Sequence, residues 1–278
     1  MDVKTTQVQV GPHRIAATVF GDAEPAVVIE PAFGGSAQSW FAVAEALAGQ
    51  AKVVAYDRAP YGASSRAQDD RTPREIARDL HGVLDALGIS RPVVLVGHSA
   101  GGVYARAFAG LYRDEVAGMV LVDSAHEAQE QVLHGQLPWR VGLLEALTLP
   151  MLGLLPAKML NGADRRSIIR EFRASKRLTA ADRPLAPGDL GDRPLIVLTR
   201  GPGAKVHPSW QLWRDLHAEL AELSTNSRHI VADDSNHYIH KSEPELVLTA
   251  IRDVLDSART SVPLSQALTR APGTGSER

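Results

Sequence analysis

The stretch VVLVGHSAGG, residues 93–102, joins an apolar run to a serine that lies between two glycines. Its first four residues have the composition of a buried strand, and the following VYARAFAGLY, residues 103–112, has that of a helix. Ser99 therefore falls on a sharp turn from strand to helix, which Gly97 and Gly101 allow because they carry no side chains. Such a Gly-x-Ser-x-Gly turn, a nucleophile elbow, raises a serine above the edge of a sheet. We interpret Ser99 as a candidate nucleophile.

Strand and helix patterns alternate on both sides of this stretch. Short apolar runs without strict alternation are typical of strands buried on both faces, and they occur in AVVIE (26–30), KVVAYD (52–57), PVVLVG (92–97), GMVLVD (118–123) and PLIVLT (194–199). Apolar residues spaced three and four apart predict amphipathic helices near residues 40–47, 76–87, 213–223 and 247–255. Alternating residues around Gly11-Pro12 predict an antiparallel hairpin at a sheet edge. The fold class is therefore α/β, a mostly parallel, doubly wound sheet with an antiparallel N-terminal hairpin.

The composition excludes several classes of protein. The chain has 278 residues, a net charge of −2 and no cysteine. Disulfides, thiolate metal sites and a catalytic thiol are excluded, and nothing favours nucleic acid as a partner. The N-terminus does not resemble a signal peptide, and the most apolar stretch, residues 146–157, is too short to span a bilayer. We expect a cytoplasmic protein with no membrane span; the oligomeric state is not indicated.

One region interrupts the alternation of strands and helices. Residues 126–190 contain helix-like pieces but no convincing strand, and we predict that they form a helical cap over one end of the sheet. Residues 1–125 and 191–258 then form the core. Residues 259–278, rich in small residues, proline and glycine, are expected to be a mobile tail.

Two further motifs give the chain a family resemblance. YDRAPYGASS (56–65) looks like the Asp-Arg-x-x-x-Gly-x-Ser segment after the fourth strand of α/β hydrolases, and SNHYIHKSEPELV (235–247) looks like their histidine loop and last helix. With the elbow, the chain resembles the α/β-hydrolase family over residues 13–256, and the order of serine first and histidine last agrees. The resemblance implies a serine hydrolase with a catalytic triad.

His237 is the candidate base for Ser99, because a serine hydroxyl needs a base to take its proton. It follows HIVAD, a plausible last strand, and precedes the last helix. His240 is its nearest rival, and we expect His98, inside the elbow, to pack in the core.

Asp123 is the candidate acid that orients the base. Most family members carry this acid after the strand at 194–199, where this chain has RGPGAKVHPSW and no carboxylate. Asp123 ends the preceding strand, at the same edge of the sheet, as the acid does in some members. Asp233 and Asp234 are alternatives, but they lie too close in sequence to His237 to turn back onto its ring. We predict a hydrogen bond from His237 Nδ1 to Asp123.

Backbone N–H groups of Phe33 and Ala100 are the candidate oxyanion hole. Ala100 follows the serine at the start of its helix. Pro31 and Ala32 fall where family members usually carry His-Gly, so Phe33 supplies the second N–H; Pro31 has none to give.

The leucine-rich part of the predicted cap, from Leu143 to Leu155, favours an apolar substrate. We expect cleavage of a small, largely apolar ester or related acyl bond through an acyl-enzyme on Ser99. C–C bond hydrolysis and acyl transfer to an alcohol or peroxide use the same triad and stay open, as does a non-catalytic ligand-binding role. No metal or organic cofactor is expected, since no ligand cluster or phosphate-binding loop occurs.

Overall fold

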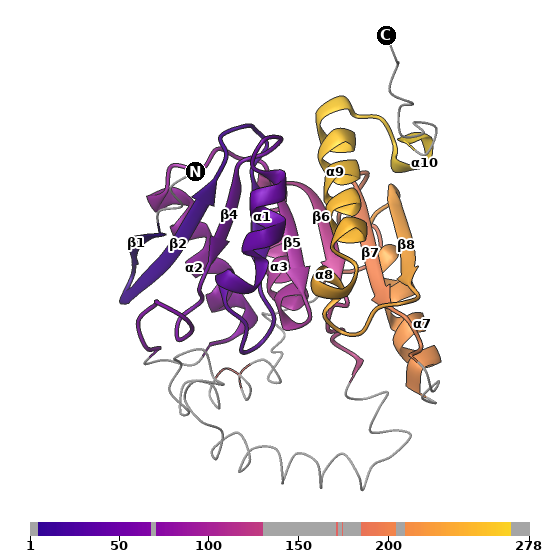
Figure 1. Ribbon diagram of the computed structural model, residues 1–278, viewed down its shortest axis with the longest axis horizontal. Coiled ribbons are helices and arrows are strands. Elements are labelled where there is room, and N and C mark those ends of the chain that lie inside the picture. Colours follow the sequence, from indigo (N-terminus) through magenta and orange to yellow (C-terminus); the bar gives the residue numbers. More distant parts are fainter. Residues whose placement is uncertain are drawn as a thin grey trace, which may run out of the picture.

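The computed structural model describes residues 5–67, 71–129, 171, 174, 185–203 and 209–267. Within them, one eight-stranded sheet has the order β1-β2-β4-β3-β5-β6-β7-β8 (Figure 1). The strands are β1 (Thr5–Val10), β2 (His13–Phe20), β3 (Val27–Glu30), β4 (Val53–Tyr56), β5 (Val93–His98), β6 (Val116–Val122), β7 (Leu195–Arg200) and β8 (Ser227–Ala232). β1 and β2 form an antiparallel hairpin, β2 also runs antiparallel to β4, and the remaining pairs are parallel. The predicted sheet and hairpin are confirmed.

The central strands are apolar up to their carboxyl ends because both faces of the sheet are covered. Every residue of β3, β4 and β5 is buried. Successive side chains point to opposite faces, so Val27 and Ile29 join one core cluster and Val28 joins the other. This explains why the strand sequences show no alternation of polar and apolar residues.

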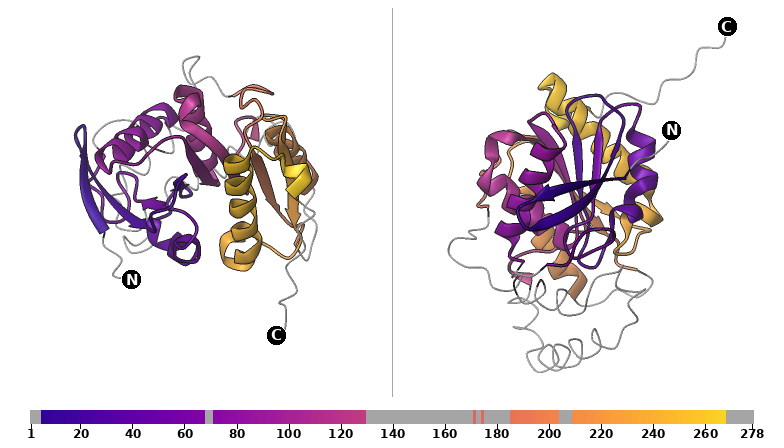
Figure 2. Two further views of the ribbon diagram at one scale, coloured as in Figure 1. Left: turned by 90° about the horizontal axis from the view of Figure 1, so that it is seen from above. Right: turned by 90° about the vertical axis from the view of Figure 1, so that its left-hand side faces the viewer.

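Helices cover the two faces in separate layers (Figure 2). α1 (Phe41–Leu47) and α9 (Pro244–Thr260) pack on one face, whereas α2 (Pro73–Ala86), α3 (Ala100–Leu111) and α7 (Ser209–Ala221) pack on the other. The short helices are η1 (Ala37–Trp40), η2 (Arg113–Glu115), α8 (Ile239–Ser242) and α10 (Leu264–Ala267). The apolar faces predicted from the spacing are buried, apart from a few partly exposed members such as Leu87 and Trp213.

Local sequence explains where α2 begins. α2 starts with a capping box, in which Thr72 Oγ1 accepts from the Glu75 N–H at 3.3 Å and Glu75 Oε2 accepts from the Thr72 N–H at 2.8 Å. Pro73 fits the first turn because its missing N–H is not needed there.

The order of strands places a topological switch point at the carboxyl end of β3. The chain passes from β3 to β4 on one side and then to β5 on the other, so the loops after β3 and β5 diverge there. In open α/β sheets ligands bind at this switch point.

Most of the predicted cap and tail lies outside the described residues. Glu171 and Ala174, within the predicted cap, are buried. Within the predicted tail, α9 continues to Thr260, and α10 contributes the buried Leu264 to one core cluster. No helix in the described part of the chain is long and apolar enough to cross a membrane.

Candidate active site

Ser99 occupies a strained turn between β5 and α3. Its backbone has φ 54° and ψ −123°, a left-handed conformation that costs a non-glycine residue about 1–3 kcal/mol. The flanking glycines make room for the turn: a Cβ on Gly97 would lie 2.6 Å from Gly102 Cα, and one on Gly101 would lie 2.1 Å from the Glu30 carbonyl oxygen. Ser99 itself is partly exposed. The elbow geometry expected from the sequence is present.

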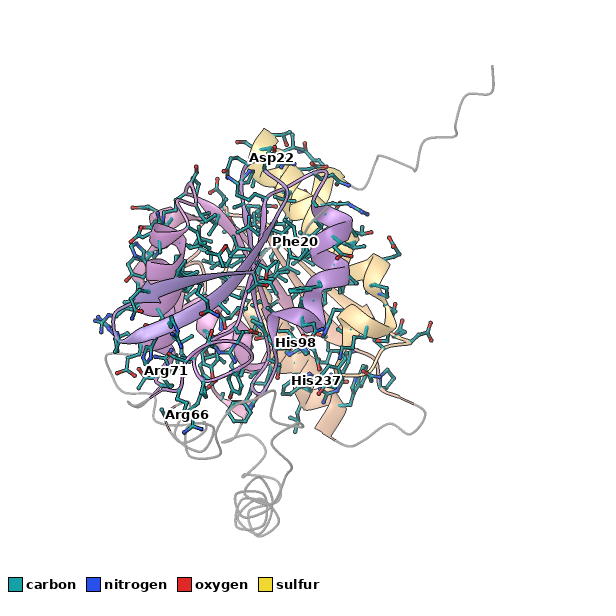
Figure 3. The ribbon with its side chains drawn as sticks, turned by 60° about the vertical axis from the view of Figure 1, so that its left-hand side comes forward. Phe20, Asp22, Arg66, Arg71, His98 and His237 are labelled. Atoms are coloured by element: carbon teal, nitrogen blue, oxygen red, sulfur yellow. The ribbon has the colours of Figure 1, made fainter. Side chains whose placement is uncertain are left out.

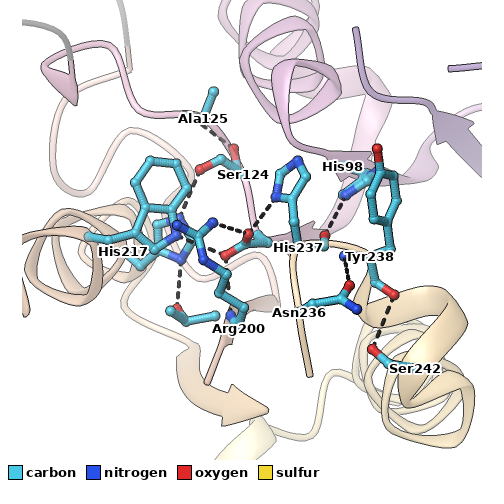
Figure 4. Close-up of polar contacts among 12 residues, drawn as sticks. His98, Ser124, Ala125, Arg200, His217, Asn236, His237, Tyr238 and Ser242 are labelled. Carbon is cyan, nitrogen blue, oxygen red and sulfur yellow. Dashed lines mark hydrogen bonds and ion pairs between the residues drawn. The ribbon is translucent and has the colours of Figure 1, made fainter. Parts of the chain in front are cut away.

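Asp123 and His237 meet at the same edge of the sheet. Asp123 follows β6 with its side chain fully buried, and His237 lies in the loop between β8 and α8. His237 Nδ1 lies 2.6 Å from Asp123 Oδ2 (Figure 4). A carboxylate only accepts hydrogen bonds, so Nδ1 carries the proton and Nε2 has its lone pair available. The predicted hydrogen bond is present, whereas Asp233 and Asp234 lie exposed in the turn after β8.

Backbone contacts bring Ser99 to this pair. The Ser99 N–H donates to the carbonyl of Val122, next to Asp123, at 3.2 Å. His98, the residue before Ser99, donates from Nε2 to the His237 carbonyl at 2.8 Å. Figure 3 shows His98 and His237 together at the end of the molecule opposite Asp22. The three residues predicted to act together are thus linked through their immediate neighbours in the chain.

Asp123 accepts more hydrogen bonds than the sequence suggested. Arg200 donates from Nη1 to Oδ2 at 2.6 Å and from its backbone N–H to Oδ1 at 3.2 Å, and Trp213 Nε1 donates to Oδ1 at 2.8 Å. Burial alone would raise the pKa of Asp123, but the His237 hydrogen bond and the Arg200 charge outweigh it and hold the pKa well below its usual range. The carboxylate is therefore a stable anion. We call Asp123, His237, Arg200 and Trp213 the Asp123 cluster.

A chain of hydrogen bonds supports the turn after Asp123. His217 Nε2 lies 2.8 Å from the Ser124 carbonyl, and its Nδ1 lies 2.6 Å from Thr199 Oγ1. Because the carbonyl only accepts, Nε2 carries the proton and Nδ1 accepts from the Thr199 hydroxyl, which in turn accepts from His229 Nε2 at 2.7 Å. Burial lowers the pKa of His217 to about 4, so the ring is neutral near pH 7.

The other two histidines near the elbow are buried. Burial, with the nearby His237, lowers the pKa of His98 to about 4. His240, the rival base, stacks on Trp40 with ring centroids 4.1 Å apart, and among the described residues neither of its ring nitrogens has a hydrogen-bond partner. Burial lowers its pKa to about 3. His98 thus packs as predicted and also holds the backbone of His237.

The loop after β3, where Phe33 lies, is held by an arginine from the β4 loop. Arg58 donates from Nη1 to the Pro31 carbonyl at 2.7 Å and from Nη2 to the Ala32 carbonyl at 3.0 Å. Gly34 follows with φ 71°, a conformation that favours glycine. Ala100 is the first residue of α3, so its N–H lies at that helix's N-terminus.

Arg58 also lies at the centre of a buried group of charged and tyrosine side chains. We call this group, made of Glu30, Tyr56, Arg58, Tyr104 and Glu171, the Arg58 cluster. Arg58 Nη1 is 2.5 Å from Glu30 Oε1, and Nη2 is 3.4 Å from Glu171 Oε1. Tyr104 donates to Glu171 Oε1 at 3.0 Å, and Tyr56 donates to Glu30. Burial raises the pKa of Glu30, although Arg58 and Tyr56 offset part of that effect.

The sequence reasoning did not foresee the roles of Arg58, Arg200, Trp213 and His217. A signal existed for two of them: Arg58 belongs to the Asp-Arg segment quoted above, and Arg200 stands where most family members carry their acid. In the described part of the chain, no group of three or more His, Asp or Glu side chains is arranged to hold a metal ion.

Comparisons with known proteins agree with the fold. A model of the alpha/beta hydrolase fold matches residues 25–185. Because that match spans more than half of the chain, this protein belongs to the alpha/beta hydrolase family, as its sequence motifs predicted. Over 249 residues the chain is 27% identical to the uncharacterized protein YqjL of Bacillus subtilis (strain 168), covering 89% of this chain and 90% of that protein.

Solved structures show the same architecture. A thermophilic esterase from Thermogutta terrifontis has a TM-score of 0.64 and 24% identity, covering 92% of this chain and all (100%) of that one. The enol-lactonase from Burkholderia xenovorans LB400 has a TM-score of 0.67 and 19% identity, covering 90% of this chain and 100% of that one. At these identities the likeness concerns the fold alone, while membership in the family supports a hydrolase activity.

Proposed function

We propose that this protein is a serine hydrolase that cleaves a small, largely apolar ester, or a related acyl bond, through an acyl-enzyme on Ser99. The observation that carries the proposal is the 2.6 Å hydrogen bond between His237 Nδ1 and the buried Asp123 carboxylate, beside a serine on a strained elbow. A base with its Nε2 lone pair free and a nucleophile raised above the sheet edge are what acyl transfer requires.

In the proposed reaction, His237 Nε2 removes the proton from Ser99 Oγ as that oxygen attacks the ester carbonyl carbon. The N–H groups of Phe33 and Ala100 stabilise the oxyanion of the tetrahedral intermediate. His237 then returns the proton to the leaving alcohol as the C–O bond breaks and the acyl-enzyme forms. Water attacks the acyl-enzyme by the same steps and releases the acid, while Asp123 holds the imidazole and stabilises its positive charge.

The preference for an apolar acyl or alcohol group rests on the sequence. The leucine-rich segment from Leu143 to Leu155 precedes Glu171 in the chain, and Glu171 is buried against Arg58 beside the loop of Phe33. We propose that residues 126–190 form the cap, and that some of its leucines line the substrate pocket.

The test is labelling and turnover. A fluorophosphonate is expected to label the protein once, and p-nitrophenyl esters from acetate to laurate are expected to be cleaved. Ser99→Ala should remove labelling and lower kcat by at least about 10⁴-fold. Ser90→Ala, which changes an exposed serine, is the control and should leave both unchanged. Labelling that survives Ser99→Ala would contradict the proposed nucleophile.

C–C bond hydrolysis and acyl transfer to an alcohol or peroxide use the same acyl chemistry. Adding an alcohol or peroxide to the ester assay separates a hydrolase from an acyltransferase, because an acyltransferase would divert the acyl group from water to the added acceptor. A protein that binds these esters without turnover or labelling would be a ligand-binding protein instead.

A further inference from the structure

The end of β7 contributes a cation to the candidate site. The chain has Arg200 at the end of this strand, and no carboxylate follows until the helix α7. Arg200 Nη1 and His237 Nδ1 each lie 2.6 Å from the same oxygen, Asp123 Oδ2. The arginine and the base therefore share one oxygen of one buried carboxylate.

The groups around this carboxylate leave Arg200 as its principal counter-charge. Among the residues that the structure describes, the titratable and charged ones facing the pair are His98 from β5, Arg106 from α3, Arg200 from β7, His217 from α7, and Tyr238, His240 and Lys241 after β8. His98, His217 and His240 have pKa values of about 4, 4 and 3, because burial disfavours their charged forms. They are neutral near pH 7.

The two remaining cations have other partners. Arg106 pairs with Glu127 at 2.8 Å, and Lys241 Nζ lies 5.1 Å from the centre of the Tyr238 ring. In the described part of the chain, Arg200 is thus the permanent cation that contacts Asp123.

We propose that Arg200 is a positioning residue for the base: by sharing the Asp123 carboxylate with His237, it sets the pH below which the site loses its proton acceptor. This inference rests on the proposed function. A carboxylate that serves His237 alone favours the imidazolium form of the ring more strongly than one already paired with a guanidinium. The guanidinium also repels the proton that would make His237 positive. Both effects predict that removal of the Arg200 charge moves the acid limb of the activity profile to higher pH.

Geometry limits the size of this effect. Asp123 is fully buried, but the Arg200 side chain is 34% exposed, so water screens part of its charge. We expect the acid limb of the kcat/KM profile to move upward by about one pH unit when the charge is removed. Loss of packing alone would lower the rate or the stability without moving that limb.

The experiment measures kcat/KM for p-nitrophenyl acetate, and the rate of fluorophosphonate labelling, from pH 4 to 9. Arg200→Met keeps the aliphatic stem and removes the charge, and Arg200→Lys keeps the charge. Arg91→Met is the matched control: Arg91 is also partly exposed and pairs with Asp85 at 2.6 Å, but on the α2 side of the molecule. Thermal midpoints of all variants report folding.

The expected result is an acid limb moved to higher pH in Arg200→Met, with the limbs of Arg200→Lys and Arg91→Met at the wild-type position. The proposal is overturned if Arg200→Met has the wild-type limb, or if Arg200→Lys moves as far as Arg200→Met. If Arg200→Met does not fold, Arg200→Gln replaces it under the same criteria. Activity that survives Ser99→Ala would instead overturn the proposed function, so the two failures are distinguishable.

Discussion

Two ionic clusters lie at the carboxyl edge of the same sheet, and they differ in access to water. In the Asp123 cluster the carboxylate is buried, but the side chains of Arg200 and His237 are 34% and 35% exposed. In the Arg58 cluster the charged side chains of Glu30, Arg58 and Glu171 are at most 1% exposed. One cluster can exchange a proton with a substrate, whereas the other is sealed.

This difference in exposure suits the two clusters to different roles. The Asp123 cluster holds a low-pKa anion next to a partly exposed histidine, an arrangement in which a proton can move. The Arg58 cluster holds a carboxyl group whose pKa is raised by burial, and its arginine fixes the carbonyls of Pro31 and Ala32. We infer that the second cluster shapes the loop beside the elbow and takes no part in proton transfer.

The largest effect is expected from Asp123→Asn. The amide can donate as well as accept, so it favours the wrong tautomer of His237 and cannot stabilise the imidazolium, and kcat should fall by about 10⁴-fold while the fold persists. Ester turnover measures kcat, and circular dichroism measures whether the fold persists. Asp85→Asn, at an exposed ion pair with Arg91, is the control with unchanged kcat. A loss of under ten-fold for Asp123→Asn would show that another group orients the base.

Arg58→Met should lower the stability of the fold more than it changes catalysis. It leaves Glu30 and Glu171 buried without their cation, so the free energy of unfolding should fall by about 3–5 kcal/mol. Arg91→Met, which removes a partly exposed arginine paired with Asp85 and Glu115, should cost less than Arg58→Met. Urea titrations measure both. If the folded variant showed a displaced acid limb in its pH profile, the separation between the two clusters would be wrong.

Much of the fold could be predicted because each strand shows a local signal. The apolar runs from 26 to 199 lie within one or two residues of the observed strands, since strands buried on both faces must be apolar throughout. The elbow and the loop of His237 are also local, because a tight turn needs glycine and the base follows the last strand.

The contacts around these residues were harder to predict because they join distant parts of the chain. Arg58 meets Glu171 across 113 positions, and Arg200 meets Asp123 across 77. The sequence marks both arginines by their position, but it does not give the distant residues that they contact. The end of β7, where most family members carry a carboxylate, supplies a donor to Asp123 in this chain.

Stability should depend on pH in opposite directions at the two carboxyl groups. The pKa of Asp123 is lowered by folding, so its contribution is present above its unfolded value, near 3.9, and is lost as the pH falls through the folded value. The pKa of Glu30 is raised, so its contribution is present below its unfolded value, near 4.3, and is lost as the pH rises through the folded value.

Urea unfolding of wild type, Asp123→Asn and Glu30→Gln at several pH values tests this contrast. The stability advantage of wild type over Asp123→Asn should shrink toward low pH, and its advantage over Glu30→Gln should shrink toward higher pH. Groups that do not contact the substituted carboxyl group titrate alike in wild type and variant, so their contributions cancel in the difference. If the stability differences of both variants from wild type changed with pH in the same direction, the proposed electrostatic contrast between the two clusters would be wrong.

The smallest effect is expected from Trp213→Phe, which tests how finely the Asp123 cluster is held. Phenylalanine keeps an aromatic ring near the Arg200 guanidinium, which lies 4.8 Å from the Trp213 ring centre, but loses the Nε1–H bond to Asp123 Oδ1. The Arg200 backbone N–H still donates to that oxygen, so kcat should fall by no more than about ten-fold, which corresponds to about 1.4 kcal/mol.

Trp210→Phe is the control for this change, because Trp210 Nε1 donates to the Arg200 carbonyl at 3.3 Å and not to Asp123. Its kcat should equal that of wild type. Equal losses in the two tryptophan variants would assign the effect to packing around Arg200. A loss of kcat in Trp213→Phe as large as in Asp123→Asn would mean that Arg200 alone does not position the Asp123 carboxylate. The indole N–H on Oδ1 would then be required for Oδ2 to contact His237.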